Sequence, residues 1–475
     1  MNSTLSDSSL WSEAVFGGIE LGDKRLTKRL VQLGKQLSNC SGSSLSQSSL
    51  GDEALVEGGY RFLRNHRVKA SQIASGGYDV TGQLAKSQEL LLAIEDTTSL
   101  VYSHEVSKQL GYTSNNPHAK AKGYQVHSTI LMDATTEKTI GLIAQNRWCR
   151  NSSAYGKSTQ RNTRAYKDKE SYKWEKNTHE LEQRLSEKLA DTISVCDRDA
   201  DVYEYIQYKT EHHQRFVVRA CHNRRLNGLS EMLFTYLSEL PVLGTYSIDV
   251  AQKANRPKRH VELMIKAAKV ILQPPERRKG EEPLKPISIN VVYATEIHPQ
   301  TEAVLEWILL TTEDISTFEQ ARTVSRYYEL RWRIEDFHKA WKSGTNVELL
   351  RMQSADNLEK MIVILSFVAI RLLQLKEYFE QDYQLLKAEH VCIPCNELLS
   401  EIEWKVLWKT VEKTELPSQT PDAYWAFRAI AKLGGWTDSK RTGKAAWSTI
   451  WNGWFKLNER IEGFLIAQSI FMDKM

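Results

Sequence analysis

Two short apolar segments, each ending in an aspartate, constrain the fold of this chain more than any other feature. Residues 90–96 read LLLAIED, and residues 192–197 read TISVCD. Segments of this length and composition are typical of β-strands that are buried on both faces of a sheet. Asp96 and Asp197 are then expected at strand ends, where an aspartate is either a turn residue or part of a functional site.

The segments around these two strands predict the order of the remaining elements. We expect strands at residues 126–133, 138–145 and 215–219, and helices at about 172–190 and from about 200. The order strand, strand, strand, helix, strand, helix, strand is that of a ribonuclease H-like α/β domain. Residues 223–312 hold four strand-like segments with Pro-, Gly- and charge-rich joins, which predicts a β-rich insertion.

Length and composition indicate several domains and no membrane segment. A chain of 475 residues can form two to four domains. We expect a helical domain at 1–70, the α/β domain at 71–375 with its insertion at about 223–312, and a helical domain at 376–475. Six cysteines without a secretory signal indicate a cytoplasmic location, and the longest apolar run is too short to span a membrane. Cys392 and Cys395 lack the second ligand pair of a zinc site.

Residues 328–342, read as YELRWRIEDFHKAWK, predict a helix with a polar stripe. We expect the helix to begin with a capping box at residues 316–319 and to end at Gly344. At about 100° per residue, four side chains share a stripe about 60° wide. They are Tyr328, Arg331, Glu335 and Lys342. The stripe is either a solvated face or a row of functional groups.

Two predicted N-terminal helices have basic faces. One runs from Lys24 to about Ser38 and the other from Asp52 to about Arg64, with a Ser-rich loop between them. The pair fits either a small DNA-binding module or a helical cap with solvated lysines. The net charge of +4 is too small to identify a partner.

Asp96, Asp197 and Glu335 form the candidate catalytic group. Three carboxylates at one point repel one another strongly unless cations neutralise them. Such hard oxygen ligands suit Mg²⁺, with Mn²⁺ able to substitute. Two ions about 4 Å apart activate a nucleophile on one side of a phosphate and stabilise the leaving oxygen on the other. We therefore predict phosphoryl transfer with two Mg²⁺ ions per active site.

These motifs resemble those of DDE transposases of the bacterial insertion-sequence-four family, and within it most closely the Tn-five (IS-fifty) group. The match includes AIEDTTS at 93–99, VCDRDAD at 195–201, and the spacing Tyr-x2-Arg-x3-Glu-x6-Lys at 328–342. It extends to residues 60–65, 215–219 and 433–443. This chain departs from the pattern at Asn39, Cys40, Asp199 and Cys221.

The resemblance implies a bacterial cut-and-paste transposase that acts on double-stranded DNA, both transposon ends and target. Asp96, Asp197 and Glu335 are then its metal-binding catalytic residues. The enzyme nicks one strand at each end, and the new 3′-OH attacks the opposite strand to form a hairpin. Water reopens the hairpin, and the 3′-OH attacks target DNA. A homodimer in a paired-end complex is implied as well.

The resemblance also assigns DNA-binding and dimerisation residues. The DNA contacts are Arg29, Arg61, Arg219, Trp307, Tyr328, Arg331, Lys342 and Arg351. Trp307 is either a core tryptophan on a strand or the platform on which a flipped base stacks. A C-terminal stripe at helical spacing contains Trp447, Ile450, Trp451, Trp454, Ile461 and Phe464. This stripe is either intramolecular core or, as we favour, a dimer interface.

Two other functions compete with transposition. A ribonuclease H-like, structure-specific DNA endonuclease would use the same acids without strand transfer, but a minimal nuclease lacks the β insertion and the basic N-terminal helices. A non-catalytic DNA-binding protein does not require Asp96, Asp197 and Glu335 to be intact.

Overall fold

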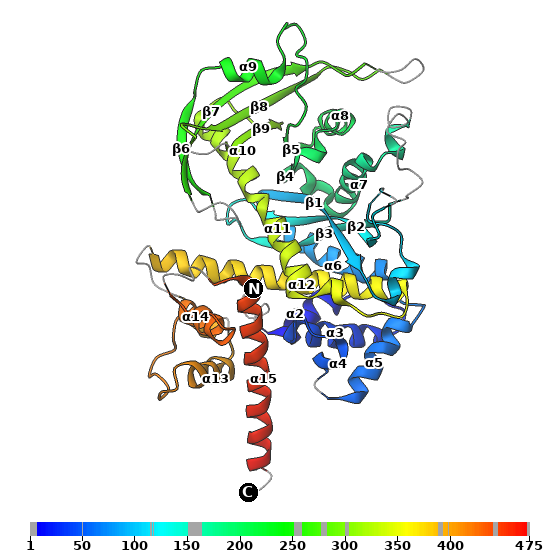
Figure 1. Cartoon of the computed structure of the whole chain (residues 1–475), viewed down its shortest axis with the longest axis vertical. Coiled ribbons are helices and arrows are strands. Elements are labelled where there is room, and N and C mark those ends of the chain that lie inside the picture. Colours follow the sequence, from blue (N-terminus) through cyan, green and yellow to red (C-terminus); the bar gives the residue numbers. More distant parts are fainter. Residues whose placement is uncertain are drawn as a thin grey trace.

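A nine-stranded mixed sheet forms the centre of the part of the chain that the structure describes (Figure 1). Its strand order is β3-β2-β1-β4-β5-β9-β8-β7-β6. The structure is a computed structural model. It describes residues 7–49, 51–114, 116, 118–150, 164–250, 259–276, 283–299, 304–387, 393–397, 399–439 and 445–472.

The first five strands have the predicted ribonuclease H-like arrangement. They are β1 (Leu91–Tyr102), β2 (Lys122–Asp133), β3 (Thr139–Trp148), β4 (Thr192–Cys196) and β5 (Arg215–Arg219). Strand β2 pairs antiparallel with β1 and β3, whereas β4 pairs parallel with β1 and β5. Helices α7 (Lys173–Leu185) and α8 (Tyr203–Glu211) flank β4 in sequence, which confirms the predicted fold class.

The strand that bears Asp96 is longer than predicted. Strand β1 does not stop at Asp96 but continues to Tyr102, because its antiparallel pairing with β2 extends that far. Its parallel pairing with β4 does end near the predicted place, at Ile94 and Val195. Asp96 therefore lies just beyond the parallel ladder rather than at the end of its strand.

The predicted insertion extends the core sheet. It consists of α9 (Leu233–Glu239), β6 (Gly244–Val250), β7 (Arg259–Leu272), β8 (Ile287–Glu296) and β9 (Glu306–Thr311). Strand β9 pairs antiparallel with β5, and β8, β7 and β6 follow in antiparallel order. The strand that closes the insertion thus returns the chain to the edge of the core beside β5.

The predicted late helix is divided into three parts. They are α10 (Phe318–Leu330), α11 (Trp332–Lys339) and a π-helical turn over Ala340–Gly344. The capping box lies one residue later than predicted, on Thr317 and Gln320. The Ser316 hydroxyl instead donates to the Asp314 carboxylate at 2.6 Å, so Ser316 remains outside the helix.

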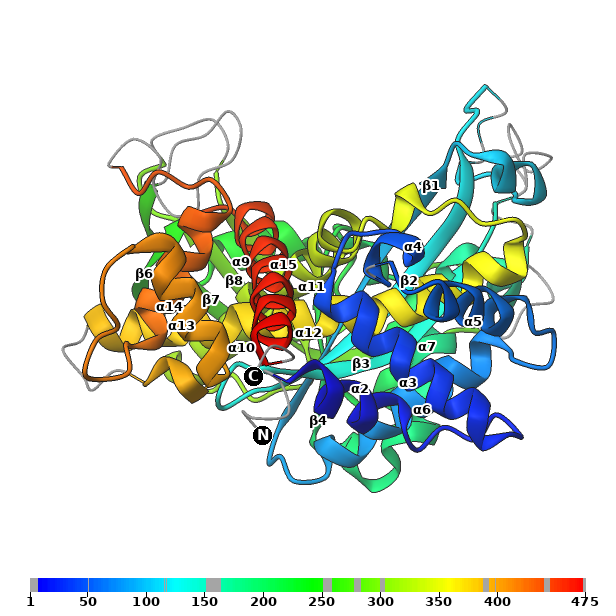
Figure 2. The same cartoon turned by 90° about the horizontal axis from the view of Figure 1, so that it is seen from below.

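Helix α12 (Ala355–Lys387) crosses the molecule alongside the sheet, with the C-terminal helices toward one of its ends and the N-terminal helices toward the other (Figures 1 and 2). The N-terminal helices are α2 (Ser8–Phe16), α3 (Lys24–Asn39), α4 (Leu45–Ser48), α5 (Glu53–Arg64) and α6 (Ala70–Ala85). Phe367 of α12 contacts Phe16 and Tyr78 at ring-centroid distances of 5.9 and 5.8 Å. One hydrophobic core therefore joins the N-terminal helices to the sheet.

The C-terminal helices correct the predicted dimer stripe. They are α13 (Glu401–Val411), α14 (Ala423–Leu433) and α15 (Trp447–Met472). Ile450 and Trp454 are buried in a core shared with α13 and α14, Ile461 packs against that core, and Trp451 packs against the main core. The expectation that Ile450 and Trp454 face a partner is wrong, because helices of the same chain cover them, whereas Trp451 and Ile461 are only half-buried. Phe464 is 47% exposed. The side chain of Trp447 lies outside the described residues.

None of the helices in the described ranges is long and apolar enough to cross a membrane.

Candidate active site

The alternation of side chains along two strands places both aspartates on one face of the sheet. Ile193 and Val195 of β4 belong to the core beneath α10–α12, and Leu92 and Ile94 of β1 belong to the same core. Side chains alternate between the two faces along a strand, so Asp197, two residues after Val195, and Asp96, two residues after Ile94, point to this same face. Because β1 and β4 are parallel neighbours, these two acids lie close together at the end of their ladder.

Arg331 connects Asp96 with the third acid. Its Nη1 lies 3.6 Å from Oδ2 of Asp96, and its Nη2 donates to Oε1 of Glu335 at 3.0 Å. Arg331 is buried at the break between α10 and α11, whereas the Glu335 side chain is 43% exposed. The structure therefore brings together the three acids that the sequence predicted to form one site.

The electrostatics of the site favour a bound cation. Burial and, next, the charge of Asp197 raise the pKa of Asp96 to about 6, whereas Arg331 opposes the shift. Burial also raises the pKa of Asp197, against the backbone N–H of Asp199 that its carboxylate accepts at 2.9 Å. Clustered carboxylates of this kind are hard oxygen donors that fit a divalent metal ion.

An aromatic and cationic group borders the acids. The buried Tyr328 ring contacts Trp307 edge to face at 5.6 Å. The guanidinium groups of Arg219 and Arg331 lie 6.0 and 5.8 Å from the Tyr328 ring. Trp307 is only 6% exposed, so in this structure it packs as a core residue beside the site. Lys342 follows on the π-helical turn and is half-buried.

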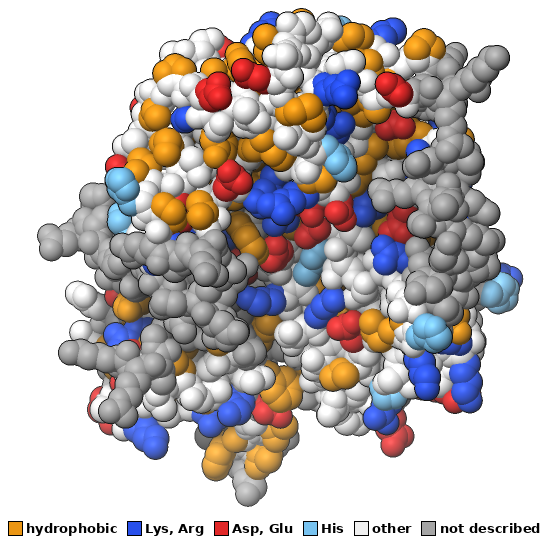
Figure 3. Space-filling view, turned by 45° about the horizontal axis from the view of Figure 1, so that its top comes forward, with side chains coloured by type: hydrophobic (Ala, Val, Ile, Leu, Met, Phe, Trp, Pro, Cys, Tyr) orange, Lys and Arg blue, Asp and Glu red, His pale blue; other side chains and the backbone are white. Residues whose placement is uncertain are grey.

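The predicted N-terminal DNA contacts lie on the terminal helices instead of at the acids. Arg61 on α5 is exposed and lies 3.4 Å from Glu57. Arg29 on α3 is half-buried, and its Nη1 donates to Gln32 at 2.7 Å. Arg351 is exposed in the segment that precedes α12. Basic and acidic side chains lie next to one another near the centre of the face drawn in Figure 3.

A buried polar network behind Asp96 was missed from the sequence. On the opposite face of β1, Glu95 accepts from Asn177 at 2.8 Å and contacts His127 at 3.3 Å. His127 in turn contacts the Thr97 hydroxyl at 3.0 Å. The only sequence signal was a charged residue next to Asp96 in an apolar strand. Lys173, whose charge opposes the rise in the pKa of Asp197, gave no signal in the sequence.

A second cluster of potential metal ligands is already satisfied. Ligand atoms of Asp201, Cys221 and His222 lie within 4.8 Å of one another. The Asp201 carboxylate, however, pairs with Arg224 and accepts the backbone N–H groups of Cys221 and His222 at 2.7 and 2.8 Å. A cation there would compete with Arg224, so we interpret this cluster as a hydrogen-bonded structural contact and not as a metal site.

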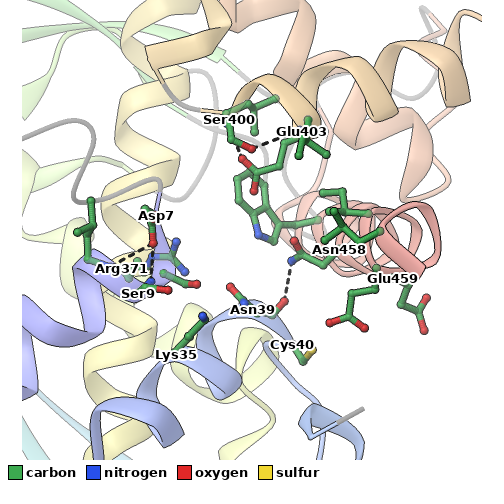
Figure 4. Close-up of a pocket in the computed structure, with 18 of the residues that line it drawn as sticks. Asp7, Ser9, Lys35, Asn39, Cys40, Arg371, Ser400, Glu403, Asn458 and Glu459 are labelled. Carbon is green, nitrogen blue, oxygen red and sulfur yellow. Dashed lines mark hydrogen bonds between the residues drawn. The ribbon is translucent and has the colours of Figure 1, made fainter. Parts of the chain in front are cut away.

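Asn39 and Cys40 line a pocket between the N- and C-terminal helices (Figure 4). The pocket has a volume of about 870 Å³, and none of the three acids lines it. The Asn39 carbonyl accepts from Asn458 of α15 at 2.7 Å. Burial raises the pKa of Cys40 to about 11, with Glu462 and Glu459 of α15 adding to the shift. Both residues therefore lie against the C-terminal helix.

A ribonuclease H-like sheet with three clustered carboxylates defines a class, the metal-dependent polynucleotidyl transferases and endonucleases. Residues 61–372 match the sequence model of the transposase DDE domain, and residues 8–68 match that of the transposase DNA-binding domain. The chain belongs to the transposase DDE domain family, and it is a DNA transposase that depends on divalent metal.

One solved structure is also similar to the chain. It is the cryo-EM structure of a piggyBac transposase synaptic complex with hairpin DNA. The two chains share 12% sequence identity with a TM-score of 0.37, over 82% of this chain and 76% of the other.

Proposed function

We propose that this enzyme is a cut-and-paste transposase of the insertion-sequence-four family, in the Tn-five group. The observation that carries the proposal is the position of Arg331 between Asp96 and Glu335. It supports a site in which the spaced Tyr, Arg, Glu and Lys of residues 328–342 act together. The reaction is then nicking, hairpin formation by the 3′-OH, hairpin opening by water, and strand transfer to target DNA.

Asp96, Asp197 and Glu335 are proposed to hold two Mg²⁺ ions, with Mn²⁺ as a substitute. Bound there, the ions would activate the attacking hydroxyl and stabilise the leaving oxygen of the phosphate. Arg331 pairs with both Asp96 and Glu335, so its single positive charge offsets part of their negative charge. It is a buried cation in direct contact with two of these acids, so we assign it to a phosphate oxygen of bound DNA.

The other predicted DNA-binding residues are proposed to act at two places. Arg219, Trp307, Tyr328, Lys342 and Arg351 would contact DNA near the scissile phosphate. Arg29 and Arg61, in the helical domain at 1–70, would contact the transposon end. The region at 376–475 is proposed to hold two subunits together through the exposed end of α15, where Phe464 lies.

The test uses full-length protein, Mg²⁺ and DNA that carries the ends of its own element. Strand products separated on a denaturing gel should show a nick first, then a hairpin of doubled length, and finally joined target DNA. DNA without the ends is the control and should remain uncut. Nicked product that never proceeds to hairpin or joining would instead favour a ribonuclease H-like endonuclease without strand transfer.

A further inference from the structure

The helix that bears Glu335 is short and is not continuous with a longer one. Helix α11 has eight residues, a break at Arg331 precedes it, and the π-helical turn over Ala340–Gly344 follows it. Glu335 and Asp96 carry like charges, so their repulsion favours rotation of α11 away from the sheet. Arg331 offsets part of this repulsion, and contacts elsewhere on α11 can restrain the rotation further.

Two ion pairs join α11 to α12 at neighbouring positions. Asp336 pairs with Lys376, and Nε of Arg333 lies 3.2 Å from Oε1 of Glu377. The side chains of Lys376 and Glu377 are only 7% and 5% exposed. Water therefore screens these pairs much less than it screens an exposed pair. We call these four residues the α11 clamp.

The clamp is fixed to the catalytic sheet as well as to α12. The Glu377 carboxylate accepts the backbone N–H of Thr139 at 2.7 Å and the Thr139 hydroxyl at 2.6 Å. Thr139 begins β3, which belongs to the same sheet as β1 and β4. Bonds therefore run from the sheet that bears Asp96, through Glu377 and Arg333, to the helix that bears Glu335.

The geometry of α11 makes the clamp a restraint on rotation. At about 100° per residue, Arg333 and Asp336 lie within about 60° of each other, whereas Glu335 lies at least about 100° from either. The two ion pairs hold one face of α11 while Glu335 on another face approaches Arg331 and Asp96. Because the two ion pairs reach neighbouring residues of α12, together they resist a rotation of α11 about its axis that a single ion pair would permit.

We propose that the α11 clamp is a positioning device that sets the affinity of the active site for metal. The proposal rests on the proposed role of Glu335 as a metal ligand. If the clamp only stabilised the fold, its loss would lower the unfolding temperature and leave metal affinity unchanged. If it positions Glu335, its loss weakens metal binding in protein that is still folded.

The experiment is a charge swap in the full-length protein. Mn²⁺ binding is measured by titration calorimetry, and the Mn²⁺ dependence of nicking is measured in parallel. Asp336→Lys and Lys376→Asp should each weaken Mn²⁺ binding by about tenfold, the scale on which second-sphere partners affect metal sites. The double variant restores the pair and should recover Mn²⁺ affinity to within about twofold of the parent. Metal-free binding to transposon ends should not change.

Two further variants keep the test decisive. Swapping the exposed pair Glu401 and Lys405 on α13 is the matched control and should leave Mn²⁺ binding unchanged. Glu377→Gln is the milder variant, used if a charge reversal prevents folding, and should also weaken Mn²⁺ binding. Single variants that lose thermal stability but keep the Mn²⁺ affinity of the unmodified protein would overturn the clamp proposal. So would a double variant that binds Mn²⁺ no more tightly than the weaker of the two single variants.

The Glu335→Ala variant distinguishes failure of the clamp proposal from failure of the proposed metal-binding role of Glu335. If Glu335→Ala binds Mn²⁺ like the parent, the proposed metal site is wrong and the clamp proposal falls with it. If Glu335→Ala loses Mn²⁺ while all clamp variants retain it, only the clamp proposal fails.

Discussion

Arg331 shows how residues of this site depend on one another. It lies at a helix break, stacks within 5.3 Å of the exposed Trp332 ring, and reaches both Asp96 and Glu335. Its charge limits the rise in the pKa of Asp96 that burial and Asp197 cause. The arginine thus keeps repelling carboxylates together, and a divalent metal would perform the same task with more charge.

Removing any one of the three acids should stop catalysis without preventing DNA binding. Each of three variants, Asp96→Ala, Asp197→Ala and Glu335→Ala, deletes a proposed metal ligand. The rate of nicking in Mg²⁺ should therefore fall by more than about tenfold. Binding to transposon ends, measured by gel shift, should remain. Glu415→Ala, at a fully exposed side chain, is the control. A variant that nicks within about tenfold of the parent means that its residue is misassigned.

Trp307 should separate hairpin formation from nicking. Closing a hairpin is easier when one base is flipped out, at a cost of a few kcal/mol, and stacking on an aromatic offsets about 1–3 kcal/mol. Trp307→Ala should therefore nick at a near-normal rate and accumulate nicked ends, with hairpins slowed at least about tenfold. An abasic nucleotide at the flipped position should partly rescue the variant.

Because Trp307 is buried against Tyr328, a second variant guards against simple unfolding. Trp307→Leu retains apolar bulk but removes the aromatic platform. If both variants slow nicking and hairpin formation equally, Trp307 is only a core residue.

At the scale of elements, the N-terminal helices differ in how freely their arginines can reach DNA. Arg61 extends into solvent from α5, whereas Arg29 packs against Gly58, where an added Cβ would lie 2.5 Å from its guanidinium carbon. Substitution of Arg29 therefore disturbs the contact between α3 and α5 as well as any DNA contact. Arg61 is the cleaner test of the DNA-binding role.

Arg61→Ala should weaken end binding through lost phosphate contact. The slope of log affinity against log salt should become shallower by about one unit, as expected for one phosphate contact. Fluorescence anisotropy across a salt series measures this, with Lys409→Ala on α13 as the control. Identical salt curves for the Arg61 variant and the parent would contradict a DNA-binding role for this helix face.

At the scale of the whole molecule, α12 and α15 determine how the domains are connected. Lys360 of α12 is fully buried and donates to the carbonyls of Leu63 and Asn65 at 2.8 and 3.0 Å, where α5 ends. Farther along, α12 also carries two of the four residues of the α11 clamp, Lys376 and Glu377. Helix α15 packs along its first half and extends away from the body of the molecule at its second (Figures 1 and 2).

The exposed end of α15 should control subunit pairing. Phe464 and Phe471 are 47% and 71% exposed, and Ile466 and Ile470 are exposed beside them. Phe464→Asp with Phe471→Asp should leave the fold and single-end binding intact but abolish the paired-end complex on a native gel. Trp454→Asp is the contrasting variant and should lower stability, because Trp454 is a core residue. Paired complexes that form normally would place the dimer contact elsewhere.

The sequence alone determined most local structure and the identity of the candidate acids. Strand β5 has the predicted ends, α3 begins at the predicted Lys24, and α5 begins one residue after the predicted Asp52, which caps it. Caps and periodicity act over about four residues, so they can be read directly from the chain. An aspartate at a strand end is often only a turn residue. The three acids were recognisable by their combination with the spaced Tyr, Arg, Glu and Lys of residues 328–342.

Only the tertiary structure decided what depends on residues far apart in sequence. The pairing of β9 with β5 made the insertion part of the core sheet, and the extension of β1 past Asp96 required β2. Trp451 and Trp454 have the same spacing whether a partner or their own chain covers them. Burial is decided by which elements meet, so the core packing of α15, the His127 network and the α11 clamp became visible only in three dimensions.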